Sequence, residues 1–254
     1  MRTRMLLSAF GVMLFAVFSV AAQEKPGTLA ALEFQKPKNG MVKQYEDGRT
    51  QKAAWHKQQK DPQPLLVWEI LSGDSTGTYI VGRLGKHWSD FDKPATPAQA
   101  ELEEFQKVVG NYVDSIVARY YDLMPEISNP DRSGTPPKLD EIITFHVRYG
   151  NESDFRSAIG RVYDAAQKTK WPVHYEWYVL HSGGDVGTYV LFLPRANWAD
   201  FEDKVDVNPF REMLKDAFGQ AEADSIVDRI DTSVQSETSE IIQFRPDLSD
   251  LPSK

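Results

Sequence analysis

The sequence contains no cysteine in its 254 residues. Disulfide bonds, thiolate nucleophiles and Cys-ligated metal sites are therefore excluded, as is a lipid-modified cysteine that would hold the protein to a membrane. Exported proteins often rely on disulfides, but a chain of this length can bury enough apolar surface to fold without them. The stability of this protein must come from its packed core.

Histidine is scarce, and its spacing argues against a metal centre. The five histidines show neither a His-x-His nor a His-Glu-x-x-His spacing, whereas a zinc site needs three or four clustered ligands. A haem iron would need an axial ligand such as a helix histidine. His56, next to Trp55, could serve, but no second feature supports it. The sequence thus predicts no metal and no cofactor.

Basic residues are outnumbered, with 29 Lys and Arg against 37 Asp and Glu and a formal net charge of −8. An acidic protein repels phosphate backbones, so the sequence predicts no nucleic-acid partner.

Long apolar runs are also lacking, apart from one at the N-terminus. Arg2 and Arg4 precede the apolar run Met5–Val20, and Ala21 and Ala22 follow it. This layout predicts a secretory signal peptide over residues 1–22; an uncleaved membrane anchor is the alternative. The protein is therefore expected to be exported, periplasmic or secreted, with no stable membrane insertion after cleavage.

The rest of the chain repeats itself at a constant spacing of 110 positions. The matching elements are Ser72-Gly73 and Ser182-Gly183, Gly77-Thr78-Tyr79 and Gly187-Thr188-Tyr189, Trp88 and Trp198, Asp90-Phe91 and Asp200-Phe201, and Asp114-Ser115-Ile116-Val117 and Asp224-Ser225-Ile226-Val227. A constant offset predicts two copies of one structural unit with almost no net insertion. We assign residues 23–135 to the first copy and 136–254 to the second.

Each copy is predicted to be a β-α-β-β-α-β unit, because residues that alternate between apolar and polar flank segments of helical periodicity. The elements expected in the second copy are a strand over Glu141–Tyr149, a helix over Asp154–Lys170, a hairpin over Val173–Leu180 and Gly187–Leu193, a helical region over Asn208–Asp231 and a strand over Glu240–Arg245. Those expected in the first copy are Leu29–Gln35, Tyr45–Gln59, Leu65–Leu71, Thr78–Leu84, a long helix over Ala98–Tyr121 and a weak last strand over Met124–Ser128.

This β-α-β-β-α-β order is that of the ferredoxin-like fold, in which helices cover one face of an antiparallel sheet. The other face would be exposed in a single copy, although it carries Trp, Tyr and Ile. Packing the two sheets against each other buries both bare faces. The sequence thus predicts an α+β fold with two ferredoxin-like repeats packed sheet to sheet as a pseudo-dimeric α/β barrel.

The Trp-x-Asp-Phe element after each hairpin, at Trp88–Phe91 and Trp198–Phe201, can be interpreted in two ways. The two aromatic residues could anchor the chain while Asp90 and Asp200 cap a turn, or the element could form the mouth of a cavity. With this element in both units, the chain resembles the dimeric α/β-barrel superfamily, which includes antibiotic-biosynthesis monooxygenases, haem-degrading monooxygenases and NIPSNAP-like domains. The resemblance implies a tandem-fused pseudo-dimer and no particular activity.

Five residues of the second copy form the candidate ligand-binding site: His146, Arg148, His174, Glu176 and Tyr178. If their strand faces line the barrel, a carboxylate, a guanidinium and imidazoles converge in a partly apolar cavity, where burial and opposite charges shift pKa values. The alternative is a structural ion pair between Arg148 and Glu176. The catalytic residues, if any, stay unassigned.

Three functions are compatible with these observations. The first is binding of a small apolar or aromatic molecule in a barrel cavity, which makes such a ligand the expected partner. The second is a cofactor-independent monooxygenase or oxidase, and the third is a structural or interaction protein with a filled core. The volume of any cavity distinguishes the third function from the other two.

Overall fold

The computed structural model of the protein describes residues 27–59, 63–131, 136–202 and 209–251. The predicted signal peptide lies outside the described residues, and so does residue 135 at the predicted boundary between the copies. Both therefore stay predictions.

The described residues form eight strands and five α-helices. The first copy has the order β-α-β-β-α-β, and the second has the same order with one additional helix before its last strand. The first copy contains β1 (Leu29–Pro37), α1 (Val42–Gln59), β2 (Leu66–Ile70), β3 (Tyr79–Lys86), α2 (Ala98–Val108) and β4 (Val113–Leu123). The second contains β5 (Leu139–Val147), α3 (Glu152–Thr169), β6 (Glu176–Ser182), β7 (Thr188–Arg195), α4 (Pro209–Phe218), α5 (Gln220–Ser233) and β8 (Val234–Phe244).

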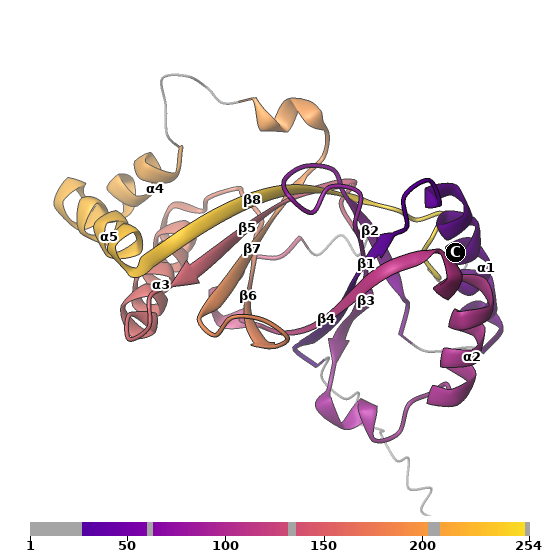
Figure 1. The fold of residues 1–254 in the computed structure, drawn as a ribbon. Coiled ribbons are helices and arrows are strands. Elements are labelled where there is room, and N and C mark those ends of the chain that lie inside the picture. Colours follow the sequence, from indigo (N-terminus) through magenta and orange to yellow (C-terminus); the bar gives the residue numbers. More distant parts are fainter. Residues whose placement is uncertain (1–26, 60–62, 132–135, 203–208, 252–254) are drawn as a thin grey trace, which may run out of the picture.

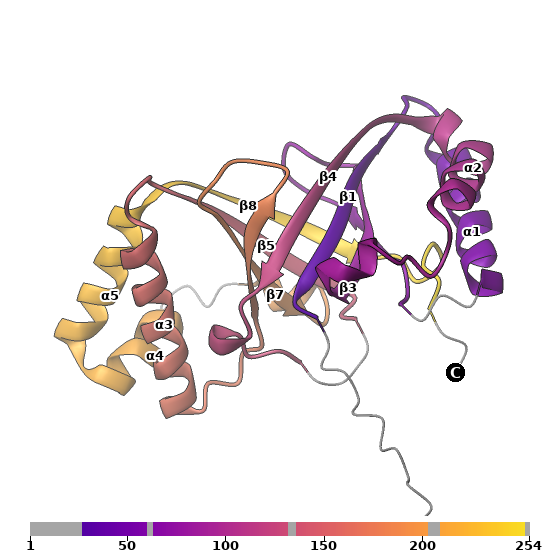
Figure 2. The same ribbon diagram turned by 90° about the horizontal axis from the view of Figure 1, so that it is seen from below.

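The strands close into one antiparallel barrel in the order β1-β3-β2-β8-β5-β7-β6-β4. Each copy supplies four consecutive strands, and the copies join twice, through β2 with β8 and through β4 with β6. The helices lie outside the barrel, with α1 and α2 at one side and α3, α4 and α5 at the opposite side (Figure 1; Figure 2). The α+β pseudo-dimeric barrel is therefore confirmed.

The inner faces of the two half-barrels share one apolar cluster. It contains residues of both copies, among them Leu32, Trp68 and Ile80 from the first and Ile142, Tyr178 and Phe244 from the second. At about 2 kcal/mol for each large side chain removed from water, this cluster accounts for much of the joint stability of the copies. Neither copy could bury these residues alone.

The copies also exchange their C-terminal segments in a symmetric way. Ser128, after the last strand of the first copy, accepts a hydrogen bond from the backbone N–H of Trp177 in the second copy at 2.9 Å. Ser249 accepts the equivalent bond from Val67 in the first copy at 3.0 Å. Each serine donates in turn to a backbone carbonyl four residues earlier, at 2.8 Å in both copies. Each copy thus covers the edge of a strand that belongs to the other.

The predicted long helix over Ala98–Tyr121 is wrong. Helix α2 ends at Val108, and strand β4 begins at Val113 after a short turn at Gly110–Tyr112. The apolar residues of this segment fit both a helical and a strand periodicity. A strand forms because β4 pairs with β1 on one side and with β6 on the other. The predicted last strand over Met124–Ser128 is instead the exchanged segment, which contains a 3-10 turn at Pro125–Ile127.

The second copy departs from the first at the same place. Asp114–Val117 lies in strand β4, whereas the identical Asp224–Val227 lies in helix α5. Strands β4 and β8 begin at Val113 and Val234, so their spacing is 121 rather than 110. The expectation of almost no insertion is therefore wrong for the last part of the repeat, where α5 is additional.

Candidate functional site

The layer between helices and sheet differs sharply between the two copies. Helices α1 and α3 keep the spacing of 110, so their positions correspond one to one. Polar or charged residues of the first copy stand where the second has an apolar core: Gln35 for Phe145, Tyr45 for Phe155, Arg49 for Ile159, Lys52 for Val162 and His56 for Ala166. All ten are buried. The fold does not require these polar groups, because the second copy builds the same layer from apolar side chains.

A cavity of about 600 Å³ lies in this layer of the first copy. We call it the helix–sheet pocket. It is bounded by β1, β3 and β4, helix α2 and the connection that precedes α2, and Arg49 reaches it from α1. Its apolar wall includes Leu65, Val81, Phe91, Leu102, Phe105 and Tyr120. Its size falls within the range of small-molecule sites.

Arg49 lines the helix–sheet pocket with a guanidinium that is 2% exposed. Its Nε and Nη2 atoms have no hydrogen-bond partner among the residues that the structure describes. Leaving a buried charge unpaired costs several kcal/mol, so such a group calls for an explanation. An anion in the pocket would supply the missing acceptor.

Glu101 is a partly buried carboxylate of the same pocket. Its Oε1 atom lies 3.1 Å from Lys52 Nζ and 3.3 Å from His56 Nε2, while its Oε2 atom has no partner among the described residues. Burial would raise the pKa of Glu101, but the contacts with His56 and Lys52 outweigh burial and lower it to about 2. Glu101 is therefore ionised and neutralises one of the cations beside it.

Two further contacts hold Lys52 in place. Its Nζ donates to the Glu101 carbonyl oxygen at 3.1 Å and lies 3.9 Å from the centre of the Trp55 ring. Burial is the main reason that the pKa of Lys52 falls, although Glu101 opposes it. Lys52 thus acts as a support behind Glu101 and does not itself line the pocket.

A series of hydrogen bonds runs from Tyr45 on helix α1 to Gln35 and Glu33 on strand β1, and these two β1 residues line the pocket. The Tyr45 hydroxyl donates to Gln35 Oε1 at 2.9 Å, and Gln35 Nε2 donates to Glu33 Oε2 at 2.7 Å. Burial raises the pKa of Tyr45, so its hydroxyl keeps its proton and fixes the orientation of the Gln35 amide.

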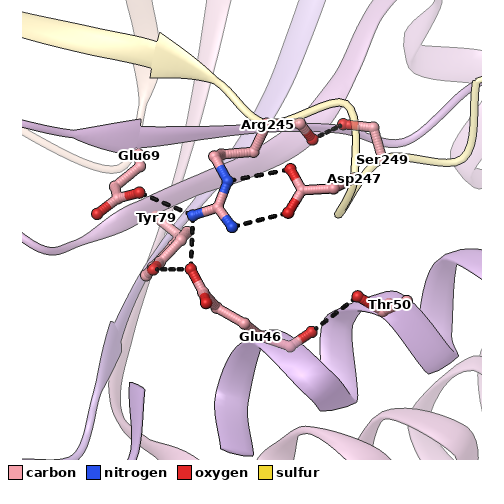
Figure 3. Close-up of polar contacts among 7 residues, drawn as sticks. All are labelled: Glu46, Thr50, Glu69, Tyr79, Arg245, Asp247 and Ser249. Carbon is pink, nitrogen blue, oxygen red and sulfur yellow. Dashed lines mark hydrogen bonds and ion pairs between the residues drawn. The ribbon is translucent and has the colours of Figure 1, made fainter. Parts of the chain in front are cut away.

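The second copy holds helix α1 in position through Arg245 (Figure 3). The Arg245 guanidinium lies 2.5 Å from Glu46 on α1, 2.8 Å from Glu69 on β2 and 2.8 Å from Asp247. The Tyr79 hydroxyl donates to Glu46 at 2.8 Å. Arg49 follows Glu46 by one helical turn, so the placement of the pocket depends on both copies.

The structure does not bring the five predicted site residues together. His146 Nδ1 lies 3.2 Å from the Thr188 hydroxyl, Arg148 donates to the Thr232 carbonyl oxygen, and His174 is exposed. Glu176 and Tyr178 instead line a cavity inside the barrel. The alternative ion pair between Arg148 and Glu176 does not form either.

The physical reason is strand order. Strand β7 lies between β5, which carries His146, and β6, which carries Glu176 and Tyr178. His146 pairs with Thr188 on β7, whereas Glu176 pairs with Phe192. Four residues of strand separate those positions by about 13 Å.

The cavity inside the barrel has a volume of about 250 Å³, and we call it the barrel cavity. Its wall is largely apolar and includes Leu32, Trp68, Ile80, Tyr121, Phe192 and Ile242. Asp140 and Glu176 also line it. Burial, and secondarily the charge of Glu176, raise the pKa of Asp140 to about 7. Burial likewise raises the pKa of Glu176, which the Tyr178 hydroxyl partly opposes.

The sequence analysis missed Arg49, Lys52, Glu101 and Asp140. The signal for Arg49 and Lys52 was present, since comparing the two first helices at the constant offset places cations opposite Ile159 and Val162. Glu101 gave no such signal, because its burial depends on the packing of α2. Asp140 stands opposite Ala30 at the same offset, so its signal was present, although its burial depends on closure of the barrel.

The capping role of both Trp-x-Asp-Phe elements is confirmed. Asp90 accepts from the His87 backbone N–H at 2.9 Å, and Asp200 accepts from that of Ala196 at 2.7 Å. In the first copy the element has a second role, because Asp90 and Phe91 line the helix–sheet pocket.

His56 does not offer a ligand position to a haem in the helix–sheet pocket. Its ring is buried against Glu101 and Trp55 and does not line the pocket. Within the described ranges, no group of three or more His, Asp or Glu residues is placed to hold a metal ion. No helix in the same ranges is long and apolar enough to span a membrane.

Comparison with solved structures identifies the architecture. A monooxygenase-like protein from Fusobacterium nucleatum superposes with a TM-score of 0.54 at 12% identity, over 88% of this chain and 94% of its own. A monooxygenase-like protein from Lactobacillus acidophilus gives 0.52 at 10% identity, over 87% and 94%. The chain has the dimeric α/β-barrel fold. Chlorite dismutase from Candidatus Nitrospira defluvii, in complex with imidazole, also resembles this barrel, with a TM-score of 0.51 at 14% identity over 88% of this chain and 93% of that one.

No protein-family model and no curated protein sequence matches the chain. At such low identities, the similarity to these barrels shows the fold alone.

Proposed function

We propose that the protein binds a small molecule with an apolar or aromatic body and one anionic group in the helix–sheet pocket of the first copy. The observation that carries this proposal is the guanidinium of Arg49, which lines the pocket, is buried and lacks partners for two of its nitrogens. A carboxylate or phenolate would supply acceptors in the planar geometry that guanidinium recognises.

The balance of buried charges supports an anion. Arg49 and Lys52 are both positive and buried, and Glu101 neutralises one of them. Glu33 also lines the pocket but is exposed, so water screens its charge. Arg83, Lys86 and Lys93 also line the pocket, so its basic side chains outnumber its carboxylates, which favours an anionic ligand.

The walls favour an aromatic or apolar body for this ligand. Phe91, Phe105 and Tyr120 contribute aromatic surface to the pocket, and Leu65 and Val81 contribute aliphatic surface. A pocket of about 600 Å³ accommodates two or three fused rings. The proposal therefore keeps the ligand class expected from the sequence but moves the site from the barrel to the layer outside it.

A cofactor-independent oxidase is the second candidate. In that case a substrate phenol would lose its proton to a base, and the phenolate would itself reduce O₂. Among the described residues, the carboxylates that line this pocket are Glu33, Asp90 and Glu101, and the partly buried Glu101 has its pKa lowered to about 2. A base with so low a pKa is inefficient at neutral pH. Binding is therefore favoured over oxidation, although the fold is shared with monooxygenase-like proteins.

A filled-core structural role is the third candidate, and the two cavities of about 600 and 250 Å³ disfavour it. We further propose that binding takes place outside the cytoplasm, as the predicted signal peptide suggests. That part of the proposal depends on the sequence of residues 1–22 alone.

Calorimetric titration with 2-naphthoate tests the proposal. Arg49→Ile installs the residue of the second copy, and Lys57→Gln removes a charge from the exposed side of the same helix as a matched control. We expect wild type and Lys57→Gln to bind alike and Arg49→Ile to bind at least about tenfold more weakly. Equal binding by Arg49→Ile would reject the assignment, as would equal affinity for uncharged 2-naphthylmethanol. Oxygen uptake with polycyclic phenols under air, lost in Glu101→Gln, would instead support the oxidase.

A further inference from the structure

The barrel cavity has the opposite electrostatic character to the helix–sheet pocket. Its described lining includes three acidic residues, Asp131, Asp140 and Glu176, and no Lys, Arg or His. Asp131 is exposed, whereas Asp140 and Glu176 lie deeper. A site built for an anion would not be lined in this way.

The two deeper carboxylates belong to one copy only. The equivalent positions of the first copy, at the offset of 110, hold Ala30 and Leu66, and both of these residues also line the cavity. The barrel therefore closes with apolar side chains at these positions, and the carboxylates are not required for the fold.

Asp140 is 5% exposed and has no hydrogen-bond donor among the residues that the structure describes. Among the described residues, the charged neighbour that acts on it is Glu176, which is also negative. Burying a carboxylate beside a like charge, with no donor and no cation, is strongly unfavourable. A positively charged ligand would remove both penalties at once.

We propose that the barrel cavity is a second binding site, which takes the protonated amino group of a small primary amine between Asp140 and Glu176. The apolar remainder of the amine would contact Leu32, Ile80 and Ile242. The aromatic rings of Trp68 and Tyr178 line the same space and can face an ammonium group favourably. This site is separate from the anion site of the proposed function.

The size and donor set of the cavity select a compact organic cation over a metal. A volume of about 250 Å³ corresponds to roughly eight waters at about 30 Å³ each, which matches a molecule such as benzylamine. Calcium takes six to eight oxygen ligands and magnesium an octahedral set, more than two buried carboxylates and a phenol can supply.

Protonation of Asp140 is the alternative way to reduce the repulsion between the two carboxylates. Because the pKa of Asp140 is raised to about 7, its carboxyl is mostly protonated at pH 6 without a ligand. An ammonium group would displace that proton, so amine binding at pH 6 should release protons to the buffer. At pH 9 Asp140 is already ionised, so it has no proton to release when the amine binds.

Isothermal titration calorimetry with benzylamine, benzyl alcohol and benzoate tests the site. We expect benzylamine to bind at least about tenfold more tightly than benzyl alcohol, and benzoate not to bind in this cavity. Asp140→Ala installs the residue of the first copy and should abolish amine binding, while Asp154→Asn, which removes an exposed carboxylate, should leave it unchanged. Ala30→Leu narrows the cavity but keeps both carboxylates, and it should weaken binding.

Several results would overturn this proposal. They are equal binding of the amine and the alcohol, undiminished binding by Asp140→Ala, tighter binding of Na⁺ or Ca²⁺ alone, or no heat with benzylamine up to about 10 mM. Arg49→Ile separates the two sites, because it should weaken 2-naphthoate binding and leave benzylamine binding intact. If only one of the two ligands fails to bind as expected, the result shows which of the two proposals has failed.

Discussion

Arg49 and Ile159 occupy the same position of two helices that are related by the repeat, and both are buried against the sheet of their own copy. Ile159 is part of an apolar core, whereas Arg49 lines a cavity with two unpartnered nitrogens. One fold therefore carries a core on one side and a charged pocket on the other. The equivalent positions of the second copy show how the same layer is built from apolar residues.

Replacing Arg49 by isoleucine should stabilise the protein in the absence of ligand. The change removes an unpaired buried charge and adds apolar surface, and comparable replacements of buried charges raise the free energy of unfolding by about 1–3 kcal/mol. Urea denaturation measures this change, and the exposed control Lys57→Gln should stay within about 0.5 kcal/mol of wild type. A clear loss of stability in Arg49→Ile would mean that the guanidinium already has strong partners.

Glu101 should make stability depend on acid. Its pKa is lowered from 4.5 to about 2 in the folded state, because the contacts with His56 and Lys52 outweigh burial. Its contribution is therefore fully present above about pH 4.5 and is lost as the pH falls through about 2. Since the side chain is 35% exposed, we expect Glu101→Gln to cost about 1–2 kcal/mol at pH 7.

The measurement for Glu101 is chemical denaturation at several pH values. The difference between wild type and Glu101→Gln should shrink towards pH 2. A difference that stays constant between pH 7 and pH 2 would show that the lost stability comes from packing and not from the charge.

Asp140 should have the opposite pH dependence. Its folded pKa is raised from 3.8 to about 7, so the folded state holds a proton that the unfolded state has lost. The stability of the ligand-free wild type should therefore fall as the pH rises from about 4 to about 7 and then level off. Asp140→Ala should remove this fall and be more stable at pH 8 by about 2–4 kcal/mol.

Among the described residues, Glu176 is the titratable group that acts on Asp140, and the Tyr178 hydroxyl acts in turn on Glu176. In Glu176→Leu, which installs the residue of the first copy, we expect the fall to persist but to shift to lower pH. A fall that is unchanged in Asp140→Ala would assign the titration to a different group.

The exchanged segments should contribute equally to stability. Ser128→Ala and Ser249→Ala each leave a backbone N–H, of Trp177 and Val67 respectively, without its side-chain acceptor. Each change should cost about 1–2 kcal/mol, and the double variant should show the sum because the two sites share no partner. Thermal unfolding with a single transition is the readout, and a strongly non-additive double variant would argue against two independent contacts.

The first copy by itself should not form a stable monomer. Residues 23–135 would expose Leu32, Trp68 and Ile80 and would lack the segment of the second copy that pairs with Leu65 and Val67. We expect this fragment to aggregate, to dimerise or to melt without a cooperative transition. A soluble monomer with a sharp thermal transition, measured by light scattering and circular dichroism, would contradict the shared core.

The fold could be predicted well because its signals are local and duplicated. Alternation in segments such as Glu141–Tyr149 and the constant offset of the Gly-Thr-Tyr hairpins point to strands and to a second copy. The prediction failed between Val113 and Tyr121, where apolar residues fit both periodicities and pairing with β1 and β6 decides for a strand. The same tetrapeptide, Asp-Ser-Ile-Val, is a strand in one copy and a helix in the other.

The candidate sites were harder to predict because burial is not encoded locally. Ile116 and Val117 are 43% and 45% exposed in β4, although Ile226 and Val227 of the identical segment are buried. Glu176 and Tyr178 line one cavity because strand alternation places both on the inner face of the barrel. Asp140 pairs with Pro194 and Glu176 with Phe192 on the intervening strand β7, so only the strand order and register show that the two carboxylates share a cavity.

The sequence by itself determined that two similar α+β units share a core, because each unit has an apolar sheet face that it cannot bury alone. Only the tertiary structure decided which polar groups lose their water. Arg49 on α1 and Asp140 on β5 are buried by residues that are far apart from them in the chain. Whether each charged group has a partner therefore depends on tertiary packing. A guanidinium and a carboxylate without partners inside one barrel protein are the features from which both proposed binding sites follow.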